Sequence, residues 1–254
     1  MCLINFHLGD HSNYKLIMAA NRDEFYRRPT APAGFWEDQP HILAGQDLEG
    51  MGTWLGITKS GRIAALTNYR DPNEEQHNKK SRGHIVRNFL ESSTPAADFL
   101  TSLQQENRSY GGFNLIAGHP DQLYYCNNIH DDLYPVTAGT HALSNAFLDT
   151  PWPKTVKGKK ELKNYITNNR TLSIDALFTI LSDAEEAGDD WLPDTGVGLE
   201  LERRLSPLFI KTPEYGTRCS TILLVDKQHN VTFVERTYQK GVFETENRFS
   251  FQLS

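Results

Sequence analysis

Hydrophobic residues form short runs at both ends of the chain, and polar or turn-forming residues separate these runs. Apolar runs of this length predict strands. They cover residues 2–8, 14–20, 53–58, 62–68, 113–117, 123–126, 134–143 (a pair of strands), 220–225, 231–236 and 242–249. Only the polar residues 9–13 separate the first two runs, so we expect the chain to open with a hairpin.

Between these runs the apolar spacing changes to three and four residues, which is typical of one face of a helix. Helices are predicted over residues 84–90, 95–103, 154–168 and 173–184. Strands, helices, strands, helices and strands follow one another without a regular strand-helix-strand alternation. This order favours an α+β fold of mostly antiparallel sheets covered by helices. No repeat or linker divides the chain, so residues 1–254 are expected to form a single domain.

Two stretches follow neither spacing. Residues 29–40 contain three prolines and are expected to be irregular surface chain. Residues 70–82 are polar, and we expect either a solvated mobile loop or a lid over a site.

Composition excludes several classes of function. The 254 residues include 32 acidic and 26 basic side chains, with a net charge of -6 and no basic block, so nucleic acid is not an expected partner. No apolar stretch is long enough to span a membrane, and no secretory signal begins the chain, so we expect a cytoplasmic protein. The three cysteines are too few for a disulfide framework. The nine histidines lack metal-ligand spacing, and no glycine loop has a phosphate-binding pattern, so no metal or cofactor is expected.

Cys2 directly follows Met1. A small second residue permits removal of the methionine, which exposes a residue that carries both a thiol and a free α-amine. An α-amine with a pKa of about 7.7 to 8 is able to accept the thiol proton near neutral pH. Nucleophile and base then belong to one residue. The alternative interpretation is a small buried hydrophobe at the start of a strand.

The second strand ends in the polar string Asn21-Arg22-Asp23-Glu24. Antiparallel pairing brings the end of this strand beside the start of the first, and therefore beside Cys2. A carboxylate at Asp23 is then placed to hold the α-ammonium or to orient the thiol. The alternative is a charged turn whose surface ion pairs contribute little.

Three further polar residues stand beside apolar strands or proline-rich breaks. Asn68 ends the strand over 62–68, and Asn145 precedes a proline-rich break; each is either a turn residue or an oxyanion donor. Arg218 precedes a late strand, where it either pairs with a carboxylate or caps the sheet. Trp36 and Trp152 lie near prolines and either line a substrate entrance or anchor the core.

Several blocks of the sequence together resemble the NRDE family, also called the transport and Golgi organisation protein 2 family. These blocks are Met1-Cys2, Asn21-Arg22-Asp23-Glu24, Gly52-Thr53-Trp54-Leu55-Gly56, Leu66-Thr67-Asn68-Tyr69-Arg70, Leu143-Ser144-Asn145, Pro151-Trp152-Pro153-Lys154 and Gly216-Thr217-Arg218. They extend over essentially the whole chain, and their order makes the resemblance specific.

That family is in turn similar to the N-terminal-nucleophile hydrolases, in particular to the cysteine branch with the bile-salt and penicillin V amidases. The resemblance implies a four-layer αββα sandwich of two antiparallel sheets. It also implies that Cys2 is the nucleophile. Asp23 matches the aspartate after the second strand, and Asn21 matches the asparagine two positions before it.

The resemblance assigns three more residues. Asn68 matches an oxyanion-hole asparagine, Asn145 a second asparagine that holds the region of the nucleophile, and Arg218 an arginine near the late strand. The chain departs from the amidases at Ala20, where they carry an arginine. Arg22 stands between the asparagine and the aspartate instead, and neighbours on a strand point to opposite faces.

Two functions follow as hypotheses. The first is an amidohydrolase or acyltransferase whose Cys2 attacks an amide or thioester carbonyl of a small acyl or amide ligand, with Asn21 and Arg22 among the residues that bind this ligand. The second is a binding or carrier protein on the same fold, with a lipid, acyl-CoA or haem ligand and no chemistry. Cys126 and Cys219 are interpreted as ordinary thiols in the cores of strands.

Overall fold

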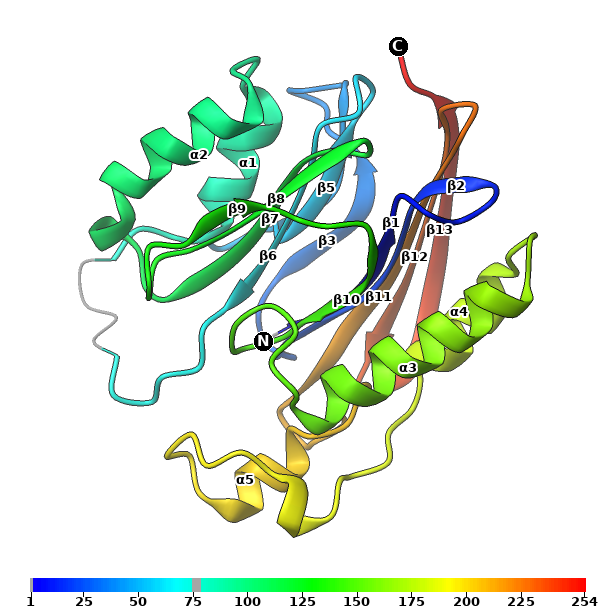
Figure 1. Ribbon diagram of the computed structural model, residues 1–254. Helices are drawn as coiled ribbons and strands as arrows, with labels where there is room; N and C mark the ends of the chain where they lie inside the picture. The colour runs from blue at the N-terminus through cyan, green and yellow to red at the C-terminus, as the bar shows by residue number, and fades with distance from the viewer. Residues whose placement is uncertain (1, 75–78) are drawn as a thin grey trace.

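A computed structural model describes residues 2–74 and 79–254 of the chain. Two antiparallel sheets pack face to face, and helices cover both outer faces, so that the elements form four layers (Figure 1). This confirms the predicted α+β sandwich. Part of the predicted loop over 70–82 falls on residues 75–78, which lie outside the described residues.

Each sheet is built largely from strands that are neighbours in the sequence. The six-stranded sheet has the order β10 (Gly139–Leu143), β1 (Cys2–Leu8), β2 (Tyr14–Phe25), β11 (Tyr215–Asp226), β12 (Asn230–Gln239) and β13 (Val242–Gln252). The seven-stranded sheet has the order β3 (Thr30–Phe35), β4 (Ile42–Asp47), β5 (Leu55–Thr58), β6 (Ile63–Asn68), β7 (Phe113–His119), β8 (Gln122–Asn127) and β9 (Leu133–Pro135). The first sheet therefore joins the two ends of the chain, because β2 pairs with β11.

The helices form the two outer layers. Helices α1 (Gly83–Glu91) and α2 (Ala96–Gln105) cover the seven-stranded sheet, whereas α3 (Pro153–Asn168) and α4 (Ile174–Leu181) cover the six-stranded sheet. The short helix α5 (Leu199–Arg204) lies in the connection to β11. Single 3₁₀ turns occupy Asn107–Ser109 and Asp189–Trp191.

The alternation of side chains along β1 shows how the layers are held together. Ile4, Phe6 and Leu8 point into the core between the sheets. Asn5 points to the other face, where Gly158 of α3 passes so close that an added Cβ would lie 2.5 Å from the Asn5 amide oxygen. Both faces of β1 are therefore buried, which explains its almost continuous apolar run.

The prediction of irregular chain over 29–40 is wrong in its first half, because residues 30–35 form the edge strand β3. Its pairing with β4 shifts register between Ala31 and Gly34. Pro32 lies within this irregularity, where its missing N–H costs no ladder hydrogen bond. A bulge at a sheet edge thus accommodates a proline-rich sequence in a strand.

The predicted strand pair over 134–143 exists, but its two strands belong to different sheets. β9 pairs with β8 in the seven-stranded sheet, and β10 pairs with β1 in the six-stranded sheet. The chain therefore crosses between the sheets at this point. The crossing delivers Ser144 and Asn145, which follow β10, to the beginning of β1.

A polar cluster fixes the loop between β10 and α3. The Asp149 carboxylate accepts hydrogen bonds from His141 Nδ1 (2.7 Å), from Lys159 Nζ (2.8 Å) and from the Ala142 backbone N–H (2.9 Å). Burial alone would raise the pKa of Asp149, but these bonds lower it to about 2. The folded carboxyl thus loses its proton more readily than the unfolded one, and the gain in stability exists above about pH 4.

We expect Asp149→Asn to lower the free energy of unfolding by about 1–2 kcal/mol at pH 7, after allowance for solvent screening. The difference from the parent should shrink as the pH falls from 4 toward 2, because the parent carboxyl then becomes protonated as well. Urea unfolding at several pH values measures this. A difference that stays constant between pH 7 and pH 2 would contradict the assignment.

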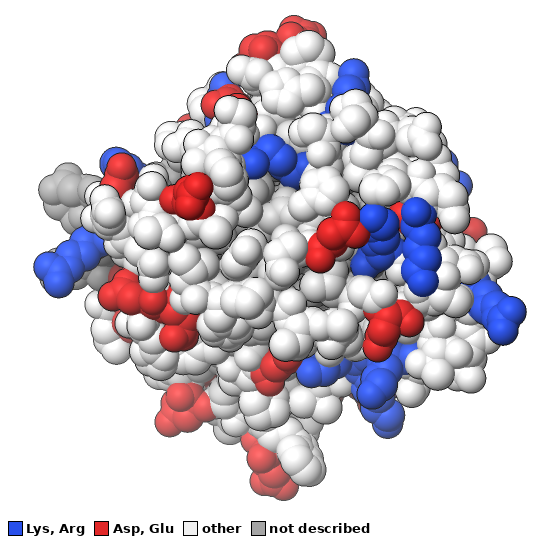
Figure 2. All heavy atoms as spheres, turned by 45° about the horizontal axis from the view of Figure 1, so that its top comes forward, with Lys and Arg blue, Asp and Glu red and all other residues white. Residues whose placement is uncertain are grey.

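Charge is mixed on the surface. On the face in Figure 2, acidic and basic side chains lie interspersed, without one continuous basic area. Within the described residues, no helix combines the length and the apolar character that crossing a membrane requires.

Candidate active site

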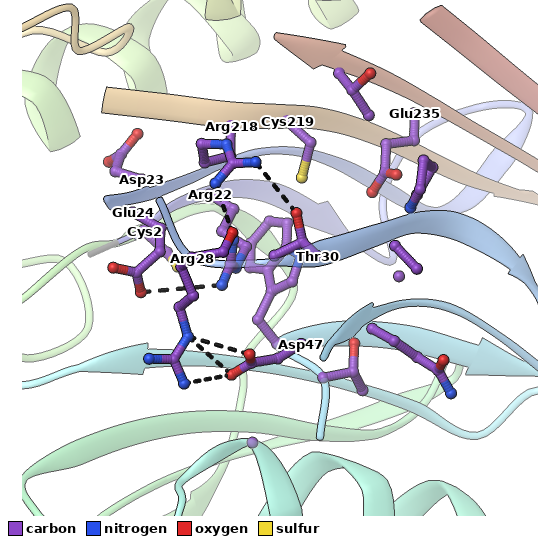
Figure 3. Close-up of a pocket in the computed structure, with 18 of the residues that line it drawn as sticks. Cys2, Arg22, Asp23, Glu24, Arg28, Thr30, Asp47, Arg218, Cys219 and Glu235 are labelled. Atoms are coloured by element: carbon purple, nitrogen blue, oxygen red, sulfur yellow. Dashed lines mark hydrogen bonds and ion pairs between the residues drawn. The ribbon is translucent and has the colours of Figure 1, made fainter. Parts of the chain in front are cut away.

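A cavity of about 250 Å³ lies between the two sheets, beside the first residue of β1. Five of the residues predicted for the site line it: Cys2, Arg22, Asp23, Asn68 and Arg218. Figure 3 shows side chains from β2, β11 and β12 on one side of this cavity and Asp47 of β4 on the other. The cavity is thus shared by the two sheets.

Cys2 is held at the cavity by its position in the sheet. It pairs with Arg22 across the hairpin, and the Ser144 hydroxyl donates to its carbonyl oxygen at 3.1 Å. Burial raises the pKa of the Cys2 thiol, and the charge of Asp23 adds to this, while Arg22 lowers it. The thiol is therefore neutral at pH 7 and needs a base to become a nucleophile.

Arg22 lies on the cavity face of β2. Its register partners are Cys2 on one side and Cys219 of β11 on the other, so its side chain stands between two thiols. Its guanidinium is 3.9 Å from the Glu24 carboxylate. Ala20 is two residues away and occupies the same strand face. The resemblance places the amidase arginine at the position of Ala20. The arginine of this chain, Arg22, therefore lies two residues further along the same face of the strand.

Asp23 is almost completely buried at the end of β2, with 1% of its surface exposed. Its carboxylate accepts a hydrogen bond from the Thr217 hydroxyl at 2.8 Å, and the Tyr215 hydroxyl donates to its backbone carbonyl at 2.9 Å. Burial raises the pKa of Asp23, whereas the positive charge of Lys154 and the Thr217 hydrogen bond lower it. The carboxylate is thus held by β11 and influenced by the start of α3.

Asn21 does not reach the cavity. It points to the helix side of β2, where its amide nitrogen donates to the carbonyl oxygens of Leu181 and Leu208 at 2.9 and 2.8 Å. Its amide oxygen accepts from the Ser220 hydroxyl at 2.6 Å. The placement of Asn21 among substrate-binding residues is therefore corrected: it ties the sheet to the end of α4 and to the segment that follows α5.

Asn68 and Asn145 have different positions. Asn68 ends β6 and lines the cavity. Asn145 lies behind it and donates from its amide nitrogen to the Asn68 carbonyl at 2.8 Å, while the Arg70 N–H donates to the Asn145 carbonyl at 2.8 Å. Asn145 therefore holds the strand end that carries Asn68.

Arg218 lines the cavity and also organises the chain after β2. Its Nη1 donates to the carbonyl oxygens of Phe25, Tyr26 and Arg28 at 3.0, 3.2 and 2.9 Å. Burial lowers the pKa of Arg218, but an arginine remains charged. One of the dashed lines in Figure 3 marks its contact with Thr30. Among residues 2–74 and 79–254, the Arg218 side chain thus donates to backbone carbonyls and to a hydroxyl, and to no carboxylate.

The tryptophans are placed differently from the prediction. Trp36 is buried in the core under α1, and its indole N–H donates to the Ala44 carbonyl at 3.1 Å, so a role at a substrate entrance is corrected. Trp152 stacks with the Arg70 guanidinium, 4.7 Å from the ring centre, outside the main cavity. The tryptophan that lines the cavity is Trp54.

The sequence interpretation missed three residues. Cys219, taken for an ordinary core thiol, lines the cavity. Glu235 of β12 lines it too; it accepts from the Ala33 N–H at 2.6 Å, and burial raises its pKa. Lys154, the second residue of α3, is buried. Only Lys154 carried a signal, since it closes the Pro151–Lys154 block. No group of three or more possible metal ligands was found among residues 2–74 and 79–254.

Two solved structures of similar fold place the chain in a structural class. One is a Caenorhabditis elegans ortholog of N-acylethanolamine-hydrolyzing acid amidase, with a TM-score of 0.55 and 10% identity over 88% of this chain and 92% of that one. The other is a mutant conjugated bile acid hydrolase from Clostridium perfringens, with a TM-score of 0.52 and 8% identity over 99% and 92%. At these identities the similarity concerns the fold, which is that of an N-terminal-nucleophile-hydrolase-like sandwich.

The sequence itself identifies the family. Residues 1–240 match the family model described as Transport and Golgi organisation 2, and the chain belongs to this family. The mouse and human homologs of Transport and Golgi organization 2 are each 37% identical over 257 residues, covering 93% of this chain and 93% of theirs. The Drosophila melanogaster protein is 28% identical over 265 residues. The predicted membership is confirmed, while the NRDE designation stays a prediction.

Proposed function

We propose that this chain is an amidohydrolase or acyltransferase that uses Cys2 as its nucleophile. The observation that carries the proposal is the position of Cys2 at the cavity, in register with Arg22 and in the same lining as Asn68 and Asp23. A fold similar to two amide-hydrolysing enzymes supports it. The substrate is an acyl amide or thioester.

The chemistry begins with removal of Met1. The free α-amine of Cys2 takes the thiol proton, and the sulfur attacks the substrate carbonyl carbon. The tetrahedral intermediate collapses to an acyl-enzyme thioester, and the leaving amine departs with the proton from the α-ammonium. Water, or an acceptor amine in a transferase, then attacks the thioester and returns the proton to the sulfur. Each bond formed to the acyl carbon is thus matched by one that breaks.

The other residues of the site stabilise charges that form in the reaction or keep the backbone of the site in position. The Asn68 amide donates to the oxyanion of the tetrahedral intermediate. The Asp23 carboxylate faces the α-ammonium of Cys2. The positive charge of Arg22 counteracts the negative potential that Asp23 produces at the Cys2 sulfur. Asn145 and Arg218 keep the backbone of the site in place through their carbonyl contacts.

The cavity favours a small substrate with polar groups. Its volume of about 250 Å³ lies below the range of about 300–1,000 Å³ that is usual for ligand pockets. Charged side chains such as Arg28 and Asp47, joined at 2.7 Å, form part of its wall. A short acyl group or a polar amide matches this space better than a long acyl chain.

The proposal is tested by mass spectrometry of the purified protein with a panel of acyl amides and thioesters. We expect loss of Met1 in the intact mass, an acyl adduct on the Cys2 peptide, and product release. Cys2→Ala should abolish both the adduct and turnover, and Cys2→Ser should reduce turnover strongly. Cys126→Ala is the matched control, because Cys126 lies in the core under α1 and α2.

The carrier hypothesis predicts the opposite pattern. Intact mass would then show complete Met1 retention in cells, and a ligand would bind equally well to the parent and to Cys2→Ala. Turnover of every substrate by Cys2→Ala at the parent rate would reject catalysis by Cys2.

A further inference from the structure

A buried carboxylate lines the cavity at some distance from Cys2. It belongs to Glu235 on β12, and only 3% of the surface of this residue is exposed. In Figure 3 the Glu235 carboxylate and the Cys219 sulfur point the same way from neighbouring strands, toward the opposite sheet. The proposed mechanism assigns no role to this carboxylate.

The register of the six-stranded sheet gives the separation between Glu235 and Cys2. One row of paired residues crosses β1, β2, β11 and β12, and it consists of Cys2, Arg22, Cys219 and Thr237. Glu235 lies two residues before Thr237, on the same face of β12. Three strand spacings span the row, which is about 14 Å. A ligand whose carbonyl lies at the Cys2 sulfur therefore reaches Glu235 with a group further along its own chain.

The Glu235 carboxylate has one free side that faces the cavity. Its Oε1 accepts from the Ala33 N–H at 2.6 Å, and its Oε2 accepts only a long hydrogen bond from the Thr221 hydroxyl, at 3.4 Å. Gly45 of β4 lines the cavity beside Oε2, and a Cβ added there would lie 3.7 Å from this oxygen. The missing side chain of Gly45 thus leaves room for a ligand atom next to Oε2.

No basic side chain in the part of the chain that the structure describes forms an ion pair with this carboxylate. Arg28 of the cavity wall is bound to Asp47 at 2.7 Å, and the Arg22 guanidinium is 3.9 Å from Glu24. A carboxylate that is buried without a cation lowers the stability of the fold. The contact with Ala33 does not require the charge, because the amide oxygen of a glutamine accepts the same hydrogen bond.

We propose that Glu235 binds a primary ammonium group of the ligand, so that the cavity takes an acyl amide or thioester with an amine at the end remote from the reacting carbonyl. The ammonium supplies the cation that the described residues do not provide, and it donates to Oε2 on the side that Gly45 leaves open. That this ligand is a substrate rests on the proposed function, whereas its binding does not.

The charge of Glu235 selects among possible ligand groups. An anionic group at this position is repelled by the carboxylate, and a hydroxyl leaves the buried charge without a counterion. A hydrogen bond between an ammonium and a carboxylate is about twice as strong as one between neutral groups. An ammonium is therefore the group that this part of the cavity distinguishes best from groups of similar size.

The test measures binding to the Cys2→Ala variant, which lacks the proposed nucleophile, by isothermal titration calorimetry at pH 7. The probes are acetamides whose nitrogen carries an alkyl chain of three to seven carbons that ends in an ammonium, a hydroxyl or a carboxylate. We expect the best ammonium probe to bind about tenfold more tightly than the hydroxyl probe of equal length, and the carboxylate probe to bind more weakly than either. Equal affinity for ammonium and hydroxyl probes at every length overturns the inference, and so does the absence of binding by every ammonium probe.

Two further substitutions, each made in the Cys2→Ala protein, locate the binding. Glu235→Gln keeps the acceptor for Ala33 and should bring the affinities for ammonium and hydroxyl probes within about threefold of one another. Glu246→Gln is the matched control on β13 and should keep the preference, since Glu246 pairs with Arg236 at 2.8 Å, and Arg236 lies over the Phe178 ring of α4. A folded Glu235→Gln protein that keeps the ammonium preference contradicts the assignment. The comparison of probes needs no substitution at Glu235, so it decides even if Glu235→Gln does not fold.

Kinetics with the parent protein separate this inference from the proposed function. If the parent hydrolyses no probe while Cys2→Ala prefers the ammonium series and Glu235→Gln abolishes that preference, the inference stands and the enzyme proposal fails. If the parent turns over ammonium and hydroxyl probes with equal kcat/KM, and Glu235→Gln leaves both values unchanged, the enzyme proposal stands and the inference fails.

Discussion

Asn68→Ala is expected to lower kcat/KM for the proposed reaction by about 100- to 1,000-fold, which is the usual cost of one lost oxyanion donor. The loss should appear mainly in kcat, because the amide acts on the charge that develops in the transition state. Asn68 lines the cavity at the end of β6, while its backbone carbonyl keeps the contact with Asn145 in the variant. Steady-state kinetics with the best substrate of the panel measure the effect.

The control for this prediction is Asn168→Ala, which makes the same substitution at an exposed position at the end of α3. Both variants should unfold within about 1 kcal/mol of the parent, since neither removes a buried hydrogen-bond partner. A kcat/KM for Asn68→Ala within threefold of the parent would remove Asn68 from the oxyanion site.

Asn21→Ala is expected to lower the free energy of unfolding by about 3 kcal/mol. Its amide makes three buried hydrogen bonds, to Leu181, Leu208 and Ser220, and their partners would be left unsatisfied in the variant. Chemical denaturation with urea measures the change. Below the unfolding transition, alkylation of Cys2 should proceed at the parent rate, because Asn21 points away from the cavity.

This prediction separates a structural asparagine from a catalytic one in the same sequence string. A variant that keeps full stability but loses Cys2 reactivity would show that Asn21 acts in the site. Asn168→Ala again serves as the exposed control, with an expected change within about 0.5 kcal/mol.

The sequence was sufficient to predict those parts of the site that depend on pairing between strands that are neighbours in the chain. The opening hairpin has a short turn, so its register follows from the chain itself, and Cys2 lies beside Arg22 as expected. The alternation along β2 then places Arg22 on the cavity face and Asn21 on the helix face, while Asp23 reaches the cavity at the end of the strand. Because both faces of β2 are buried, the pattern of apolar residues does not reveal which face is which, and Asn21 was assigned to the wrong one.

Contacts between segments that are distant in the sequence could not be predicted, because no local pattern of residues encodes them. The strands over 134–143 join different sheets, although their sequence is that of two ordinary neighbouring strands. The packing of α3 onto the six-stranded sheet buries Lys154 at the start of that helix, and no local spacing encodes that burial. Cys219 reaches the cavity because β11 pairs with β2, across about 200 residues of intervening chain.

The pairing of β2 with β11 has a consequence for biosynthesis. At about 5–20 residues per second, a ribosome needs on the order of 10–40 s to make the residues between β2 and the end of β11. During that interval β2 lacks its β11 neighbour, and the cavity beside Cys2, which β11 helps to line, is not yet complete. An aminopeptidase that acts on nascent chains therefore meets an amino terminus that β11 has not yet enclosed, so the proposed removal of Met1 does not require the finished site to open.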